Sequence, residues 1–211
     1  MINGINSREM ILEILLEIEE GEHSHVAIRN ALSKYQVLPK QDRAFITRVC
    51  EGTLEYRIQI DYIINSFSKV TVDKMKPAIR EILRSAVYQL KYMDSVPDSA
   101  VCNEAVKLAQ RKGFYNLKPF VNGVLRTIAR EMDQVRFPQK EDDLLKYLSV
   151  KYSMPEVLVT RWLEAYGEET TEKILADFLT EHPLTIRCRT YLNSKEEIIK
   201  SLESQGVHVA P

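Results

Sequence analysis

Apolar residues recur at three- and four-residue spacing through nearly every stretch of this chain up to His182, which is the pattern of amphipathic helices. The clearest case is the stretch LKPFVNGVLRTIAR, whose apolar residues share one helical face: Leu117, Phe120, Val121, Val124, Leu125 and Ile128. Each such face has to be buried against another element, and the segments follow one another through short connections. The pattern predicts about seven helices over residues 1–137, packed as an all-α bundle.

Boundary residues divide the chain further. Ser7 is a candidate helix cap, Pro77 suits a first helical turn, and Gly113 suits a helix end. The polar stretch RFPQKEDD around Pro138 marks the end of the helical domain, and three short amphipathic segments follow at residues 144–152, 155–166 and 170–179. We therefore expect a helical domain at 1–137 and a helical linker at 138–181.

The pattern changes after Pro183. The stretch LTIRCRTYL alternates apolar and polar residues like a strand, Ser194 can cap a helix that runs to Leu202, and GVHVAP has the composition of a second strand. Residues 182–211 are predicted to begin a small α/β module with a βαβ-like order. Because about 30 residues cannot cover both faces of a sheet, we expect the chain to be a piece of a longer protein.

Composition excludes several functional classes. The N-terminal stretch lacks a basic segment followed by an apolar one, and no apolar run approaches the roughly 20 residues that span a bilayer, so we expect a cytoplasmic protein with no membrane partner. The three cysteines are far apart and form neither a disulfide framework nor metal-ligand spacing. All seven glycines are isolated, which excludes a glycine-rich loop that binds phosphate. The residues indicate binding rather than catalysis, with no metal site.

Charge is distributed unevenly along the chain. Residues 73–130 carry 11 Lys or Arg against 5 Asp or Glu, whereas residues 131–181 carry 6 against 12. Long cations neutralise phosphates, Asn and Gln bond phosphate, ribose or base edges, and loop aromatics such as Phe114 and Tyr115 stack on unpaired bases. The predicted RNA-binding residues lie on two consecutive helices and, for Lys112, in the loop between them: Lys107, Arg111, Lys112, Lys118, Asn122, Arg126 and Arg130. The alternatives are a solvated helix surface or a face that contacts acidic protein.

A third helix carries Arg80, Arg84 and Tyr88 at four-residue spacing. Arg84 stands in a dense apolar helix between Leu83 and Ser85. It either extends the basic face or is packed and paired with a carboxylate.

Three blocks of the sequence resemble the NusB family, over about residues 5–135. They are KQDRAFITRVCEGTLEY, ILRSAVYQLKYMDSVPDSAVCNEAVKLAQRKG and FVNGVLRTIAR, in the order in which the family has them. One departure is Ser85, where the family has glycine. The resemblance implies an all-helical fold that binds RNA and proteins, and it leaves open whether Asn122 contacts RNA or ties two helices together.

The continuation beyond the bundle resembles the domain order of Sun/Fmu/RsmB-type methyltransferases, which modify cytosine C5 in 16S rRNA. That resemblance implies RNA as the partner and S-adenosylmethionine as the cofactor of the full-length protein. The catalytic domain would need a glycine-rich loop and a cysteine after proline, but Cys50, Cys102 and Cys188 follow Val, Val and Arg. No catalytic residue and no cofactor is therefore assigned to this chain. The alternatives are a NusB-like antitermination factor and a structural module whose basic stripe packs on residues 141–180.

Overall fold

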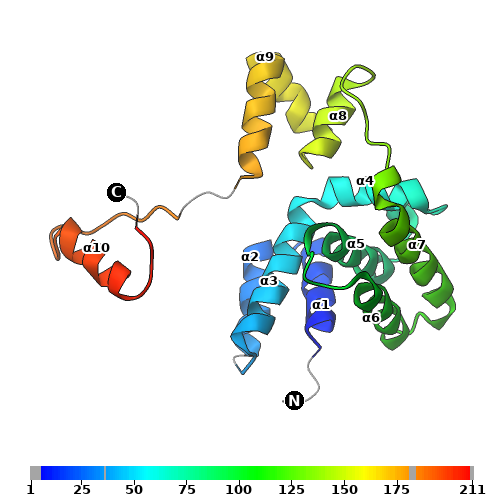
Figure 1. The fold of residues 1–211 in the computed structure, drawn as a ribbon, viewed down its shortest axis with the longest axis horizontal. Coiled ribbons are helices and arrows are strands. Elements are labelled where there is room, and N and C mark those ends of the chain that lie inside the picture. Colours follow the sequence, from blue (N-terminus) through cyan, green and yellow to red (C-terminus); the bar gives the residue numbers. More distant parts are fainter. Residues whose placement is uncertain (1–5, 36, 181–183, 210–211) are drawn as a thin grey trace. The chain divides into compact units, whose positions relative to one another are not determined.

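The computed structural model describes residues 6–35, 37–180 and 184–209, and it forms two compact units, Met1–Phe178 and Leu179–Pro211. Both units are helical in the described residues (Figure 1). The first unit contains the α-helices α1 (Ser7–Glu19), α2 (Ser24–Lys34), α3 (Lys40–Glu55), α4 (Arg57–Phe67), α5 (Pro77–Tyr92), α6 (Asp98–Arg111), α7 (Lys118–Glu131), α8 (Leu144–Lys151) and α9 (Glu156–Phe178). Short 3-10 turns occupy Val72–Lys74, Tyr115–Leu117 and Met132–Gln134.

The helix α5 lies at the centre of the bundle formed by α1 to α7. It contacts α1, α3, α4, α6 and α7, and its residues Ile79, Ile82, Leu83 and Val87 are almost fully buried. Pro77 begins α5, where a missing N–H costs nothing because first-turn N–H groups have no partner within the helix. The predicted all-α bundle is confirmed.

Helix α1 begins at Ser7, as expected, but Ser7 is not the cap. The preceding Asn6 takes that role, since its Oδ1 accepts hydrogen bonds from the N–H groups of Arg8 and Glu9 at 2.9 and 3.3 Å. Asn and Ser serve equally well as caps, so composition alone did not distinguish the two neighbours.

Helices α8 and α9 form a smaller cluster around Leu148, Val159 and Leu175, all fully buried. Helix α8 is fastened to α4 by polar contacts: Gln59 Nε2 donates to the carbonyls of Val150 and Lys151 at 3.2 Å. The predicted second and third linker helices are present as the two halves of α9, which meet at Gly167 with φ 73° and ψ 175°. The expected division into residues 1–137, 138–181 and 182–211 stays a prediction.

We expect Gly167→Ala to destabilise the α8–α9 cluster by about 1–3 kcal/mol. No atom lies close enough to clash with the new methyl group, so the cost comes from a backbone conformation that residues with a side chain rarely adopt. Trp162, which stacks on Phe178 at 5.8 Å, reports the unfolding of α9 by fluorescence. The exposed neighbour Glu164→Ala is the control and should change stability by less than about 0.5 kcal/mol. Equal stability of both variants would contradict the prediction.

The second unit contains α10 (Lys195–Ser204), which Ser194 caps as predicted: Glu197 N–H donates to the Ser194 hydroxyl while the Glu197 carboxylate accepts from the Ser194 N–H. The predicted strands are wrong for residues 184–209, which contain no strand. A strand is stable only when neighbouring strands accept and donate its backbone hydrogen bonds and cover its apolar face. Here Leu184, Ile186 and Val207 remain exposed. The first and last residues of the predicted module, 182–183 and 210–211, lie outside the described part.

Candidate nucleic-acid interface

The predicted RNA-binding residues lie on α6 and α7, except Lys112, which directly follows α6. The two helices pack against each other and are joined through the turn at Tyr115–Leu117. The apolar face of α7 is buried as expected, through Val121, Val124, Leu125 and Ile128. Since the helix is fixed by this face, its opposite side carries Arg126 and Arg130 into solvent, with Lys118 and Asn122 half-exposed along the same line. Figure 1 shows α7 leading up to the level of α4, where the chain continues toward α8.

The cations of this surface differ in how far carboxylates already neutralise them. Lys107 pairs with Glu104 at 2.7 Å, and Arg130 pairs with Glu131 at 2.6 Å. Within the described residues, Arg111, Lys118 and Arg126 form no ion pair. Those three residues are the best placed to bind phosphate.

Asn122 accepts a hydrogen bond from Arg126 Nε at 2.9 Å, within α7 itself. The amide thus orients the guanidinium and leaves the remaining N–H groups of Arg126 open to solvent. The described hydrogen bond does not tie α7 to another helix.

Lys112 is engaged differently from the other predicted residues. Its Nζ lies 3.4 Å from Glu9 Oε1 and 3.1 Å from Glu13 Oε1, both on α1. Burial opposes the charged ammonium, but these two carboxylates outweigh it and raise the pKa of Lys112. Lys112 therefore holds the end of α6 on α1, which leaves it less available to RNA than Lys118 or Arg126.

Arg84 is a packed and paired arginine rather than part of the basic face. Its Nε and Nη2 donate to the two carboxylate oxygens of Asp61 at 2.7 and 2.6 Å, and its Nη1 donates to Glu81 at 2.6 Å. Arg80 pairs with Glu19 and donates to the carbonyl of Val72. The two arginines thus cross-link α1, α4 and α5.

Aromatic side chains stand at the turn between the two basic helices. Tyr115 is 60% exposed, whereas Phe114 is half-buried against the core. A ring so exposed next to Lys118 can stack on an unpaired base.

In the part of the chain that the structure describes, the acidic residues after α7 form no ion pair with Lys118 or Arg126. Four carboxylates of residues 141–180 pair instead with lysines of the same region: Glu156 with Lys146, Glu168 and Glu172 with Lys140, Glu172 with Lys151, and Glu169 with Lys173. Because Arg126 and Arg130 stay exposed, the alternative in which the stripe is buried against residues 141–180 does not describe this structure.

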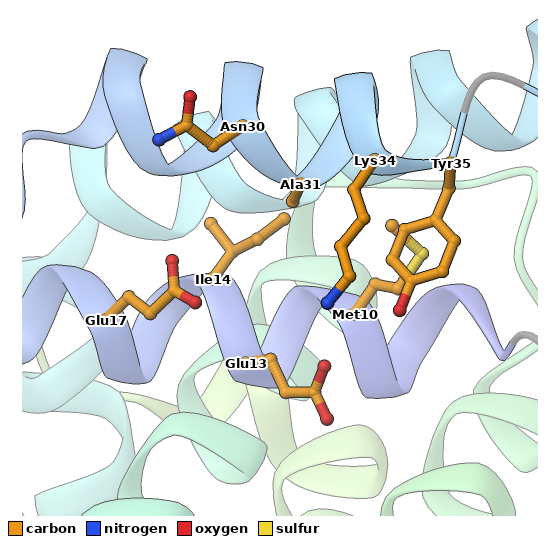
Figure 2. Close-up of a pocket in the computed structure, with 8 residues that line it drawn as sticks. All are labelled: Met10, Glu13, Ile14, Glu17, Asn30, Ala31, Lys34 and Tyr35. Carbon is orange, nitrogen blue, oxygen red and sulfur yellow. The ribbon is translucent and has the colours of Figure 1, made fainter.

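Two of the hollows among the described residues of the first unit lie away from this surface. One of about 140 Å³ separates α1 and α2, where Lys34 and Tyr35 reach across toward Met10 (Figure 2). Its rim carries Glu13 and Glu17, which disfavours a polyanion. The other, of about 270 Å³, was not foreseen from the sequence because its residues come from four separate segments: Gln59, Lys91, Phe137, Pro138, Gln139, Tyr147 and Lys151.

The described residues offer no cluster of metal-binding side chains, and no described helix is long and apolar enough to cross a membrane. The described residues also contain no strand followed by a glycine-rich loop that could bind S-adenosylmethionine. The described glycines with positive φ, namely Gly21, Gly113, Gly167 and Gly206, follow helices or join two of them.

Comparison with known proteins matches two parts of the chain to family models. Residues 5–130 match the NusB family, and residues 154–211 match the ferredoxin-like domain of RsmF/B-like methyltransferases. The chain therefore belongs to the NusB family. More particularly, it is homologous to the N-terminal part of RsmB-type methyltransferases.

Three relatives illustrate the extent of the similarity. The chain is 32% identical over 202 residues to the probable ribosomal RNA small subunit methyltransferase B of Bacillus subtilis, covering 96% of this chain and 44% of that protein. It is 32% identical over 130 residues to the transcription antitermination protein NusB of Bacillus subtilis, covering 61% of this chain and 95% of that protein. The crystal structure of PH0851 superposes with a TM-score of 0.68 at 23% identity, over 98% of this chain and 46% of that one. The chain thus spans less than half the length of the methyltransferase relative and of PH0851.

Proposed function

We propose that this chain is the RNA-binding region of an S-adenosylmethionine-dependent methyltransferase that modifies cytosine C5 in 16S rRNA. Its α6–α7 surface holds the rRNA electrostatically and positions the target for a catalytic domain outside this chain. The observation that carries the proposal is the line of solvent-facing cations along α7, in which Lys118 and Arg126 lack a carboxylate partner in the described part. Phosphates supply the missing negative charge.

The similarity to methyltransferase B extends over 96% of the chain, whereas similarity to NusB proteins extends over 61%. The antitermination alternative leaves α8, α9 and α10 without a role. In the methyltransferase proposal, those helices connect the RNA-binding bundle to the catalytic domain.

Charge reversal on α7 tests the proposal. We expect Lys118→Glu/Arg126→Glu to weaken binding of a 16S rRNA transcript, measured by filter binding across a salt series. Two lost phosphate contacts reduce the slope of log K against log salt by about 1.4 on a single strand and about 1.8 on a duplex. The matched control is Lys146→Glu/Lys173→Glu on α8 and α9, which makes the same charge change outside the proposed surface. Wild-type binding by the α7 variant, or equal losses in both variants, would refute the assignment.

A further inference from the structure

The hollow of about 270 Å³ is built where α4, the end of α5, residues 137–139 and α8 meet. In this hollow two lysines, Lys91 and Lys151, stand beside the rings of Phe137 and Tyr147. Cations beside aromatic walls suit a ligand that has a flat ring and a negative charge.

Lys91 is the cation that is free to bind such a ligand. It is half-buried, its Nζ lies 5.2 Å from the centre of the Phe137 ring and 5.5 Å from that of Tyr92, and no ion pair to it occurs among residues 6–35, 37–180 and 184–209. Burial lowers the pKa of Lys91, while Asp133 opposes that shift from a distance. A partly desolvated ammonium without a carboxylate gains more from an anion than an exposed one does.

Lys151 has a different role because its donors are already used. Its Nζ donates to Tyr147 Oη at 2.6 Å and to Glu172 at 3.0 Å, and it lies 4.9 Å from the centre of the Tyr147 ring. These contacts fix the Tyr147 ring at the wall of the hollow. A ring held in place before binding loses less conformational entropy when a ligand stacks on it.

The opposite wall is fixed as well. The side-chain amide of Gln59 bonds the carbonyls of Val150 and Lys151 and accepts a hydrogen bond from Tyr92 Oη. Phe137 stacks on Tyr62 at 5.7 Å, and Tyr62 Oη donates to the carbonyl of Arg136 at 2.7 Å. The hollow is therefore a formed site rather than a gap between mobile side chains.

We propose that this hollow holds an unpaired RNA nucleotide, with its base against Tyr147 and its phosphate on Lys91. The proposal rests on the proposed function and adds a second, base-contacting site to it. Lys118 to Arg130 spans about 18 Å along α7, and six residues of chain lie between Arg130 and Phe137 at the wall of the hollow. The proposal therefore places the hollow after the C-terminal end of α7, where one RNA strand would contact both sites.

Three variants separate the base contact at Tyr147 from the phosphate contact at Lys91. Their binding is measured with a short single-stranded RNA that carries 2-aminopurine at a central position. We expect Tyr147→Leu to weaken binding by about fivefold to a hundredfold, to leave the salt slope unchanged, and to abolish quenching of the 2-aminopurine fluorescence. Lys91→Met should reduce the slope by about 0.7, since one phosphate contact is lost. Tyr147→Phe keeps the ring and should restore the quenching, with an affinity between those of Tyr147→Leu and the wild type because the hydrogen bond from Lys151 is lost.

Lys146→Met is the matched control: it removes an exposed lysine of α8 that pairs with Glu156, and binding should stay at the wild-type level. Circular dichroism melting of each variant checks that it is folded. If Tyr147→Leu and Lys91→Met bind the RNA like wild type while the α7 variant does not, the nucleotide site is refuted and the proposed function stands. If inorganic phosphate or a polyglutamate peptide competes as well as CMP does, the hollow is a general anion contact, which also refutes the proposal.

Discussion

Replacing Arg84 by methionine is expected to lower the free energy of unfolding by about 3–5 kcal/mol at neutral pH. Methionine fills a similar space, so the lost stability comes from the missing charge and not from a cavity. Arg84 binds Asp61 through two hydrogen bonds and Glu81 through one, and the side chain of Glu81 is almost completely buried. Without the guanidinium, the Glu81 carboxylate is left charged in the interior, and Arg80, at 4.0 Å, is its one remaining counter-ion among the described residues.

The loss should depend on pH. Burial already raises the pKa of Glu81 above its ordinary value, and Arg84 is the main group that opposes this shift. In the variant the pKa rises further, so the folded state binds a proton at a higher pH than the unfolded state does. A raised carboxyl pKa means that stability falls as pH rises from the unfolded pKa through the folded one. The Arg84→Met penalty should therefore be smaller at mildly acidic pH than at neutral pH.

Urea unfolding of the wild type and Arg84→Met, followed by circular dichroism, measures the loss of stability at mildly acidic and at neutral pH. In the double variant Arg84→Met/Glu81→Gln, the buried group is neutral, and we expect it to regain a large part of the lost stability and to lose the pH dependence. A penalty below about 1 kcal/mol for Arg84→Met, or an equal penalty at both pH values, would show that water screens the network.

Helices and their buried faces followed from the sequence because the spacing of apolar residues is a local property. Val121, Val124, Leu125 and Ile128 were expected in the core and are buried there. Ser194 was expected to cap a helix and does so, since a cap depends on residues three positions apart.

Features that depend on distant residues were not predictable in the same way. Lys112 pairs with Glu13, which lies 99 residues away in the chain, so its position directly after α6 gave no sign of that partner. The strands after Pro183 were predicted from alternation, but alternation does not supply the neighbouring strand that a sheet requires. The hollow beside Lys91 was missed because Phe137 and Tyr147 come from segments that the sequence analysis treated as a boundary and a linker.

Replacing Gly52 by alanine is the second change with a large expected effect, about 2 kcal/mol of destabilisation. Gly52 lies inside α3, where alanine would ordinarily favour the helix by up to about 1 kcal/mol. Here the new methyl group would overlap the ring of Tyr88 on α5, well inside van der Waals contact. Tyr88 is buried and stacks near Tyr56 and Tyr92, so its ring has little room to move.

The close approach of α3 to the Tyr88 ring on α5 also explains why the block KQDRAFITRVCEGTLEY has a glycine at position 52. Gly52 has an ordinary helical conformation, so the requirement is for space rather than for an unusual backbone. Gly123→Ala on α7 is the matched control, because that glycine is helical too but has no atom within 4 Å of the added methyl group. It should raise stability by about 0.5–1 kcal/mol.

A double-mutant cycle with Tyr88→Leu connects the effect to the ring. Leucine removes the atoms that the methyl group would overlap, so the double variant should be more stable than the sum of the two single changes predicts, by about 1 kcal/mol or more. Thermal and urea unfolding of the four proteins in the cycle give this coupling. If the single changes simply add, the cost of Gly52→Ala comes from elsewhere in α3. If Gly52→Ala stabilises the protein as Gly123→Ala does, α3 and α5 are not packed as closely as the structure places them.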